Sequence, residues 1–169
     1  MLPPHRPASC CAFVLVLLWL LAMASPAMAR EIQGRVVGIS DGDTVTVLTE
    51  QRRQVRVRLA EIDAPERRQP FGDRARQMLS GLAFERRVRV VVTGTDRNGR
   101  AIGRMFVGTV DANAEMVRRG GAWVFRRYSN DPALLRLEAK AREARRGLWA
   151  LPPGQRVPPW EWRENRRRR

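Results

Sequence analysis

Short β-strand patterns fill residues 32–59 and restrict the possible fold more than any other feature of the chain. The segment 32–39 is apolar and β-branched, the segment 43–49 alternates Thr with Val or Leu, and a third alternating segment ends at Leu59. The connections, Ser40-Asp41-Gly42 and residues 50–53, are short and polar, so consecutive strands are expected to pair antiparallel. The folded part of the chain therefore begins with a three-stranded meander.

The third strand runs directly into a loop that contains two carboxylates. Apolar side chains alternate with Arg56 and Arg58 along this strand, which places the arginines on its polar face. Pro65 lacks an amide proton and disfavours helix at the residue before it, so the strand must open into a loop there. Asp63 and Glu66 therefore lie at the mouth of a sheet. Such a place suits the binding of a metal ion and a phosphate.

Further strand and helix patterns complete the folded part. The predicted elements are a helix capped by Asp73 that ends near Phe84, strands over 87–93 and 101–108, a short helix over about 113–119 and a last helix over about 132–146. Five short strands with a helix inserted after the third predict an α+β fold, a five-stranded Greek-key β-barrel of the OB type with three α-helices. Met, Leu and Trp side chains on the helical faces are predicted to belong to the core.

The first 29 residues have the pattern of a cleaved export signal. Arg6 precedes an apolar run over 10–24, and Ala27-Met28-Ala29 has the small side chains of a cleavage site. The run is about fifteen residues long, whereas a membrane-spanning helix needs ~20. We therefore predict that residues 1–29 are removed and that the mature protein is exported, either periplasmic or secreted, without a membrane anchor.

Removal of this leader leaves a chain without cysteine or histidine, because both cysteines and the single histidine lie within residues 1–29. Disulfides, thiol nucleophiles, Ser-His-Asp triads, histidine general bases and Cys/His zinc sites are thereby excluded from the mature protein. Its core alone must hold it together, and a domain of this size buries enough surface for that.

The mature chain is strongly basic, and nearly all of its basic residues are arginine. Loss of Arg6 with the leader leaves 31 basic and 17 acidic side chains, a net charge of +14, and Lys140 is the single lysine. The planar guanidinium group matches phosphate well. A polyanionic partner is therefore expected, although charge alone leaves nucleic acid, an anionic surface and a membrane open.

Three groups of acids and arginines are predicted at one end of the barrel. They are Asp41-Gly42-Asp43-Thr44, Arg58 with 63–66, and Asp96-Arg97-Asn98-Gly99-Arg100. Singly, each has an ordinary explanation as a hairpin turn or as surface charge. Together and in this order they resemble the successive motifs of the staphylococcal nuclease (thermonuclease) family. The resemblance continues through 113–120 and 122–124, ends with 135–149, and covers about 31–149.

The resemblance implies a calcium site. The family's ligands fall on Asp43, Asp63 and the backbone carbonyl of Ala64, where the family usually has threonine. A carbonyl ligand does not depend on the side chain, and oxygen ligands of this kind select calcium over zinc or copper. Asp41 is expected to orient the metal site without binding the metal directly.

The resemblance also implies a hydrolytic mechanism, because the family's catalytic residues fall on Arg58, Glu66 and Arg100. The two arginines are expected to clamp the phosphodiester and stabilise the charge of the transition state. Glu66 is expected to act as general base for the attacking water, or to position it. The implied activity is calcium-dependent cleavage of DNA and RNA by a monomer that prefers single strands, has low sequence specificity and leaves 3′-phosphorylated products.

The chain departs from the family where tyrosines normally contact the nucleotide. One of these positions falls on Asn98 and another on Arg126, so that only Tyr128 matches. Arg126 and Tyr128 are expected to bind substrate, Arg126 through phosphate rather than base. Each lost stacking platform weakens binding by ~1–3 kcal/mol, and more phosphate contacts make binding more sensitive to salt.

The last segment, 151–169, differs in composition from the nuclease-like domain predicted over 30–150. It is rich in Pro, Trp and Arg, lacks helical or strand periodicity, and is predicted to be an extended, flexible tail. Trp160 and Trp162, interleaved with Arg163 and the terminal arginines 166–169, could extend a single-strand binding groove. Alternatively, the tryptophans dock on the barrel or the tail remains free.

Two other functions are compatible with the charge and the barrel. A non-catalytic nucleic-acid-binding OB module would look similar, but it would not require five site residues together: Arg58, Asp43, Asp63, Glu66 and Arg100. In a cationic surface-binding protein, the acids would have no functional role. A nuclease assay with and without a calcium chelator separates the three.

Overall fold

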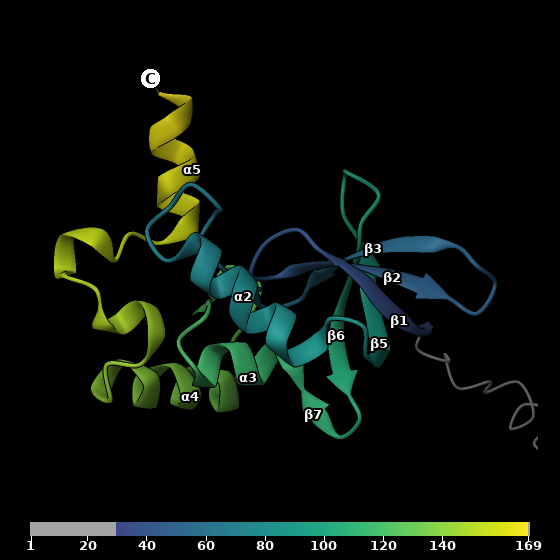
Figure 1. Cartoon of the computed structure of the whole chain (residues 1–169). Helices are drawn as coiled ribbons and strands as arrows, with labels where there is room; N and C mark the ends of the chain where they lie inside the picture. The colour runs from purple at the N-terminus through teal and green to yellow at the C-terminus, as the bar shows by residue number, and fades with distance from the viewer. Residues whose placement is uncertain (1–29, 169) are drawn as a thin grey trace, which may run out of the picture.

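The main feature of the computed structural model, which describes residues 30–168, is a closed five-stranded β-barrel (Figure 1). Its strands are β1 (Glu31–Ile39), β2 (Thr44–Thr49), β3 (Gln54–Leu59), β5 (Arg87–Thr95) and β6 (Ala101–Val107). They follow one another in the order β3-β2-β1-β5-β6, and parallel pairing of β3 with β6 closes the barrel. The predicted OB-type α+β fold is confirmed. The predicted export signal lies outside the described residues.

Two bulges bend the long strands that wrap around the barrel. The register of β1 against β2 shifts between Val36 and Gly38, and the register of β5 against β6 shifts between Val92 and Gly94. A bulge inserts an extra residue and increases the local twist. Strong curvature at these two points allows a small sheet to close on itself.

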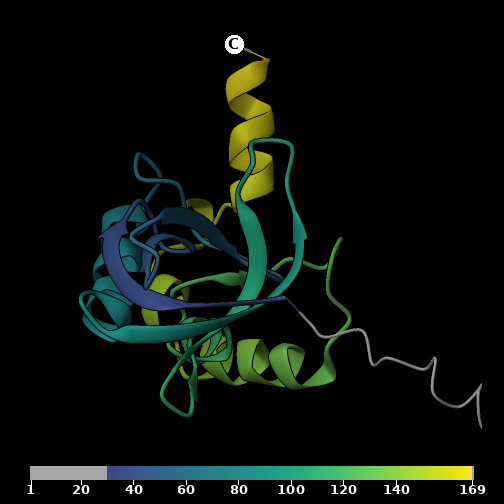
Figure 2. The ribbon, with the colours of Figure 1, turned by 90° about the vertical axis from the view of Figure 1, so that its right-hand side faces the viewer.

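Three helices cover one side of the barrel, as Figures 1 and 2 show. They are α2 (Gly72–Ala83), α3 (Ala112–Arg118) and α4 (Pro132–Glu143), with the two-residue strand β7 (Val110–Asp111) before α3 and the 3₁₀ turn η1 (Gly147–Ala150) after α4. The Asp111 carboxylate caps α3 and the Asp131 carboxylate caps α4, each by accepting a hydrogen bond from a first-turn amide. Helix α4 ends three residues before the predicted boundary.

The start of α2 differs from the prediction. Phe71, in the left-handed region at φ 73°, is the N-cap residue, and Asp73 lies in the first helical turn instead of capping it. A Cβ atom at Gly72 would lie 2.0 Å from the carbonyl oxygen of Glu66. Glycine is therefore required where the helix begins, because the helix starts directly against the backbone of the loop that carries Glu66.

The hydrophobic core continues from the barrel into the helical layer. The main cluster joins barrel residues such as Val45 and Val57 to Leu79 of α2 and Met116 of α3. A second cluster contains the predicted core residues Trp149 and Leu148 together with Trp123 of the short strand β8 (Trp123–Val124). Strand β8 pairs with β4 (Ile62–Asp63), which ties this second cluster to the loop after β3.

The C-terminal segment is not extended, which corrects the prediction and raises the number of α-helices in residues 30–168 to four. It forms a short 3₁₀ turn, η2 (Pro153–Gln155), and then α5 (Pro159–Arg167), which stands at the edge of the helical layer (Figure 1). The Trp160 ring stacks on Phe125 at 5.4 Å and meets Trp123 edge-on at 5.9 Å. A nine-residue helix is marginally stable by itself and is too short to show a clear periodic pattern in the sequence. The packing of Trp160 therefore explains why this helix forms.

No helix within residues 30–168 combines the length and apolar composition needed to cross a membrane.

Candidate active site

The turn between β1 and β2 brings two acids against the loop after β3. The Asp43 amide donates to Oδ1 of Asp41 at 3.1 Å, which fixes the turn. A Cβ atom at Gly42 would lie 2.7 Å from the Cβ atoms of both Ala64 and Ala75. Gly42 is thus required for close packing, and this packing places the two acids beside the residues that follow β3.

Arg58 joins two of the predicted metal ligands. Its Nη1 lies 2.6 Å from Oδ2 of Asp43, and its Nη2 lies 2.7 Å from Oδ1 of Asp63. The Arg58 side chain is 15% exposed, whereas the Asp63 side chain is 1% exposed. Arg58 is paired with Thr44 across β2 and β3, so the strand register itself brings Arg58 and Asp43 together.

The Asp43 carboxylate lies in a buried, acidic environment. Burial raises its pKa well above the ordinary value; Arg58 opposes this shift, whereas the charges of Asp41 and Asp63 add to it. The Ala64 amide donates to Oδ2 of Asp43 at 2.6 Å. A cation bound here would stabilise the charged carboxylates, and the available donors are hard oxygens. The oxygen donors present are therefore of the type that suits the calcium ion implied by the family resemblance.

Arg100 joins the same site from the turn between β5 and β6. Its Nε lies 2.8 Å from Oδ2 of Asp96, and its Nη1 lies 3.4 Å from the Thr44 hydroxyl, which in turn lies 3.1 Å from Oδ1 of Asp43. Burial opposes the change, but hydrogen bonds from Arg100 and Asn98 hold the pKa of Asp96 below its usual range. Of the two predicted phosphate-binding arginines, Arg58 therefore contacts Asp43 directly, and Arg100 is linked to it through the Thr44 hydroxyl.

The loop that carries Glu66 is held by a buried glutamine. The Glu66 amide donates to Oε1 of Gln69 at 3.2 Å, and the Gln69 amide donates to the Glu66 carbonyl at 2.8 Å. The side-chain amide of Gln69 donates to the carbonyl of Val157, just before α5. One side chain thus connects the loop that carries Glu66 to the C-terminal segment.

A third arginine, Arg163 of α5, also lies in the site. The sequence did not predict it as a catalytic or metal-site residue. Its Nη1 lies 2.8 Å from Oε1 of Glu66 and 3.2 Å from Oδ1 of Asp63, and its Nη2 lies 2.7 Å from Oδ2 of Asp63. Burial opposes it, but hydrogen bonds to these two acids raise the pKa of Arg163 above its ordinary value. The one sequence signal is the i, i+3 spacing of Trp160 and Arg163 after two prolines.

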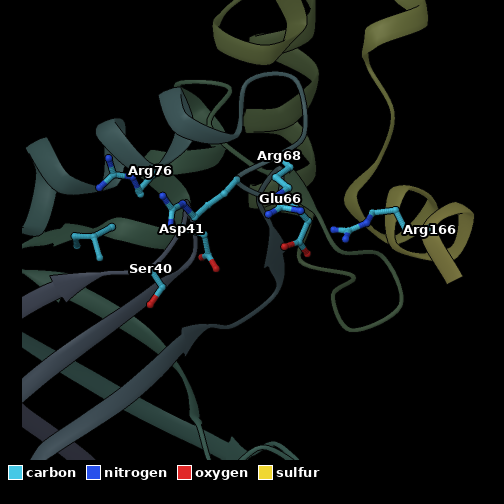
Figure 3. A pocket seen from close by; sticks show the side chains of 8 residues that line it. Ser40, Asp41, Glu66, Arg68, Arg76 and Arg166 are labelled. Carbon is cyan, nitrogen blue, oxygen red and sulfur yellow. The ribbon is translucent and has the colours of Figure 1, made fainter.

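An open pocket of about 580 Å³ lies beside Glu66. Its lining includes Ser40 and Asp41 from the β1–β2 turn, Arg67 and Arg68 from the loop, Arg76 from α2 and Arg166 from α5. Figure 3 shows Asp41 and Glu66 directed into the same space, with Arg166 extending from α5 toward Glu66. The pocket is therefore predominantly cationic, which suits an anionic strand that leads to the site.

The two predicted substrate-binding residues lie outside this cluster. Arg126 forms an ion pair at 2.9 Å with Oε2 of the buried Glu138 on α4. Tyr128 is 67% exposed and meets Phe125 edge-on at 4.9 Å. Asn98 lies in the β5–β6 turn, where its amide donates to Asp96.

The structure brings together all the predicted catalytic and metal-site residues. Asp41, Asp43, Arg58, Asp63, Ala64, Glu66 and Arg100 are linked by the hydrogen bonds, ion pairs and pocket walls given above. Within residues 30–168, no group of three or more His, Cys, Asp or Glu side chains is arranged to hold a metal ion. The expected calcium set contains two carboxylates and one backbone carbonyl.

Comparison with known proteins agrees with this geometry. The family described as staphylococcal nuclease homologue matches residues 56–151. The chain is 48% identical over 154 residues to "Protein ParB" of Escherichia coli, with 85% of both chains covered. It is 42% identical over 154 residues to "Micrococcal nuclease" of Shigella flexneri, covering 85% of this chain and 86% of that one. It is also 40% identical to an "Uncharacterized endonuclease" of Escherichia coli O157:H7, covering 83% of this chain and 91% of the other. The chain belongs to the staphylococcal nuclease homologue family.

Proposed function

We propose that this protein is a nuclease that hydrolyses phosphodiester bonds of DNA and RNA with low sequence specificity. The observation that carries the proposal is the convergence of Arg58, Arg100 and Glu66 around the buried acids Asp43 and Asp63. Relatives that cover most of the chain are named as a nuclease and an endonuclease, which supports the same activity.

Arg58 and Arg100 bind the scissile phosphate in this mechanism. Each guanidinium group offers several donors in a planar fork, and only part of this capacity is used by the acids in the structure. Their positive charges stabilise the extra negative charge on the phosphoryl oxygens in the transition state. Because both arginines are held by carboxylates, little reorganisation is needed when the substrate binds.

Glu66 accepts a proton from the attacking water. Its side chain is 37% exposed, so that water reaches it, and it lies beside the pocket that admits the strand. The water oxygen forms a bond to phosphorus, the bond from phosphorus to the 5′ oxygen breaks, and the departing oxygen takes up a proton from solvent. The products carry a 3′-phosphate and a 5′-hydroxyl.

The residues that would hold a calcium ion are Asp43, Asp63 and the carbonyl of Ala64, with Asp41 orienting the turn. When bound, calcium neutralises phosphate charge and favours attack by water. Asp43 and Asp63 are buried, so exclusion of bulk solvent strengthens every charge interaction there.

We further propose that single strands are preferred, because an open pocket lined by arginines accommodates a flexible backbone without reading base pairs. The apolar run and cleavage pattern in residues 1–29 support export to the periplasm or the medium. The enzyme would act there as a monomer.

The test is cleavage of a labelled single-stranded oligonucleotide by the purified mature protein, with calcium and then with excess chelator. We expect cleavage only with calcium, and we expect Glu66→Gln to lower kcat by about 10²–10⁴-fold while calcium binding by calorimetry is retained. Chelator-insensitive cleavage contradicts the calcium assignment. Tight oligonucleotide binding without cleavage by the wild-type protein would instead favour the non-catalytic OB module.

A further inference from the structure

Helix α5 lies outside the region matched by the family, yet it contributes a side chain to the centre of the site. The match ends at residue 151, whereas Arg163 lies on α5 and contacts both Asp63 and Glu66. The Arg163 side chain is 34% exposed in this position. It therefore closes one wall of the site as a partly buried cation.

The contact matters most for Glu66, whose carboxylate is weakly constrained by the rest of the protein. Gln69 fixes the backbone of this residue from both sides. Among the described residues, however, Arg163 is the single hydrogen-bond or ion-pair partner of the carboxylate itself. Without that partner, a half-exposed glutamate can occupy several rotamers, and a proton acceptor must lie within hydrogen-bond reach of the attacking water.

We propose that Arg163 is a positioning residue of the hydrolytic site, which bridges Asp63 and Glu66 and holds the Glu66 carboxylate in the orientation needed to accept the proton from water. This inference rests on the proposed nuclease function. It assigns a residue of the C-terminal helix to the same site.

The position of Arg163 is set by contacts that are independent of its own ion pairs. Trp160, one helical turn earlier, stacks on Phe125 and meets Trp123 edge-on. Gln69 donates to the carbonyl of Val157, just before the helix begins. The helix is thus fixed at its start by an aromatic contact and a hydrogen bond, and this places Arg163 directly over the two acids.

The Arg163 guanidinium group leaves lone pairs on the predicted calcium-binding carboxylates without a hydrogen bond. Each carboxylate oxygen can accept two hydrogen bonds. Within residues 30–168, Oδ1 of Asp43 accepts only from the Thr44 hydroxyl, and Oδ2 of Asp63 accepts only from Arg163. If Arg163 positions Glu66, its removal should lower kcat and leave calcium affinity nearly unchanged. If Arg163 merely occupies the cation site, its removal should tighten calcium binding.

The experiment uses Arg163→Ala in the full mature protein, with Arg167→Ala as matched control. Arg167 is exposed on the same helix, so the control removes the same charge without touching the site. At saturating calcium and single-stranded oligonucleotide, we expect kcat of Arg163→Ala to fall by about tenfold or more relative to the control, with KM changed by less than about threefold. Added guanidinium ion should recover part of this rate.

Calcium binding by calorimetry provides a measurement that does not depend on activity. We expect the affinities of Arg163→Ala and Arg167→Ala to agree within about fivefold. The inference would be overturned by a smaller loss of kcat or by no recovery with guanidinium ion, since Arg163 would then be structural. It would also be overturned by calcium binding tightened beyond that limit, since Arg163 would then merely occupy the cation site.

Arg163→Lys serves as a second variant in case the alanine protein does not fold. It keeps the charge but lacks the fork that reaches two acids at once, so we expect an intermediate kcat, and a kcat equal to that of wild type would also overturn the inference. Wild-type protein that fails to cleave at all overturns the proposed function. Normal wild-type cleavage with an unaffected Arg163→Ala variant overturns only the role of Arg163.

Discussion

Two arginines contact the same acid, Asp63, but they reach it from regions of very different character. Arg58 is five residues away in sequence and lies on a barrel strand whose register with β2 also places Asp43. Arg163 is 100 residues away and lies on a short helix that is held mainly by one tryptophan and one hydrogen bond. The comparison shows that one site combines a part built into the barrel with a part that depends on docking of the C-terminal segment.

The two regions should therefore respond differently to mutation. Loss of Arg58 should damage both the chemistry and the barrel. It leaves the buried Asp43 without its one ion-pair partner among the described residues and leaves Asp63 with Arg163 alone. Loss of the α5 contacts should reduce activity while the barrel stays folded.

Substitution of Arg58 should have the largest effect. We expect Arg58→Ala to lower kcat/KM by about 10³-fold or more, since the cation proposed to bind phosphate is lost, and to destabilise the fold by about 3–5 kcal/mol. Steady-state kinetics and urea unfolding measure the two effects. Arg56→Ala, an exposed arginine on the same strand, is the matched control and should change neither. An Arg58→Ala protein with normal stability would contradict the comparison.

Calcium removal should lower the free energy of unfolding, and this effect should depend on the acids of the barrel. At a calcium concentration of 100 times its Kd, binding to the folded state should add about 2.7 kcal/mol to the free energy of unfolding. Asp43→Asn should abolish this increment without lowering the stability of the calcium-free protein, because burial already disfavours the charged carboxylate. Thermal unfolding with and without calcium measures both. A calcium increment that survives in Asp43→Asn would remove Asp43 from the ligand set.

Substitution of Trp160 tests the docked region without touching a charged residue of the site. Trp160→Ala removes two aromatic contacts, worth about 1–3 kcal/mol together, and releases Arg163 from its position. We expect kcat to fall by about tenfold while β-sheet content by circular dichroism stays unchanged. Truncation after Pro153 should lower kcat to a similar extent. Full activity in the truncated protein would show that the barrel alone forms the complete site.

Substitution of Tyr128 should have the smallest effect. This exposed ring is the single nucleotide-side tyrosine retained from the family pattern, so Tyr128→Ala should weaken single-strand binding by about 1 kcal/mol or slightly more. Oligonucleotide binding to the Glu66→Gln protein, followed by fluorescence anisotropy, measures this loss without cleavage.

Arg126→Ala should leave that oligonucleotide binding unchanged if the main role of Arg126 is the ion pair with Glu138. Reduced binding with a shallower salt dependence would instead support Arg126 as a phosphate ligand.

The sequence by itself determined the barrel and predicted the acids and arginines that the structure brings together at one end of it. Strand alternation and short polar turns are local patterns, and the order of Asp43, Arg58, Asp63 and Glu66 along one meander leaves the strand register little freedom. Arg100 could be assigned to the same end of the barrel because β5 and β6 form a hairpin whose turn it closes.

Only the tertiary structure decided the role of the C-terminal segment. Helix α5 has nine residues, too few to show a clear helical period. Its contacts reach residues distant in sequence, from Phe125 and Trp123 to Asp63, which is 100 positions before Arg163. Neither spacing nor composition indicates which apolar surface Trp160 will meet, because the pairing of β8 with β4, a tertiary contact, places Trp123 and Phe125. Arg163 reaches Asp63 and Glu66 because Trp160 packs on that surface. A short helix gains its stability, and hence its position, from packing rather than from its own sequence.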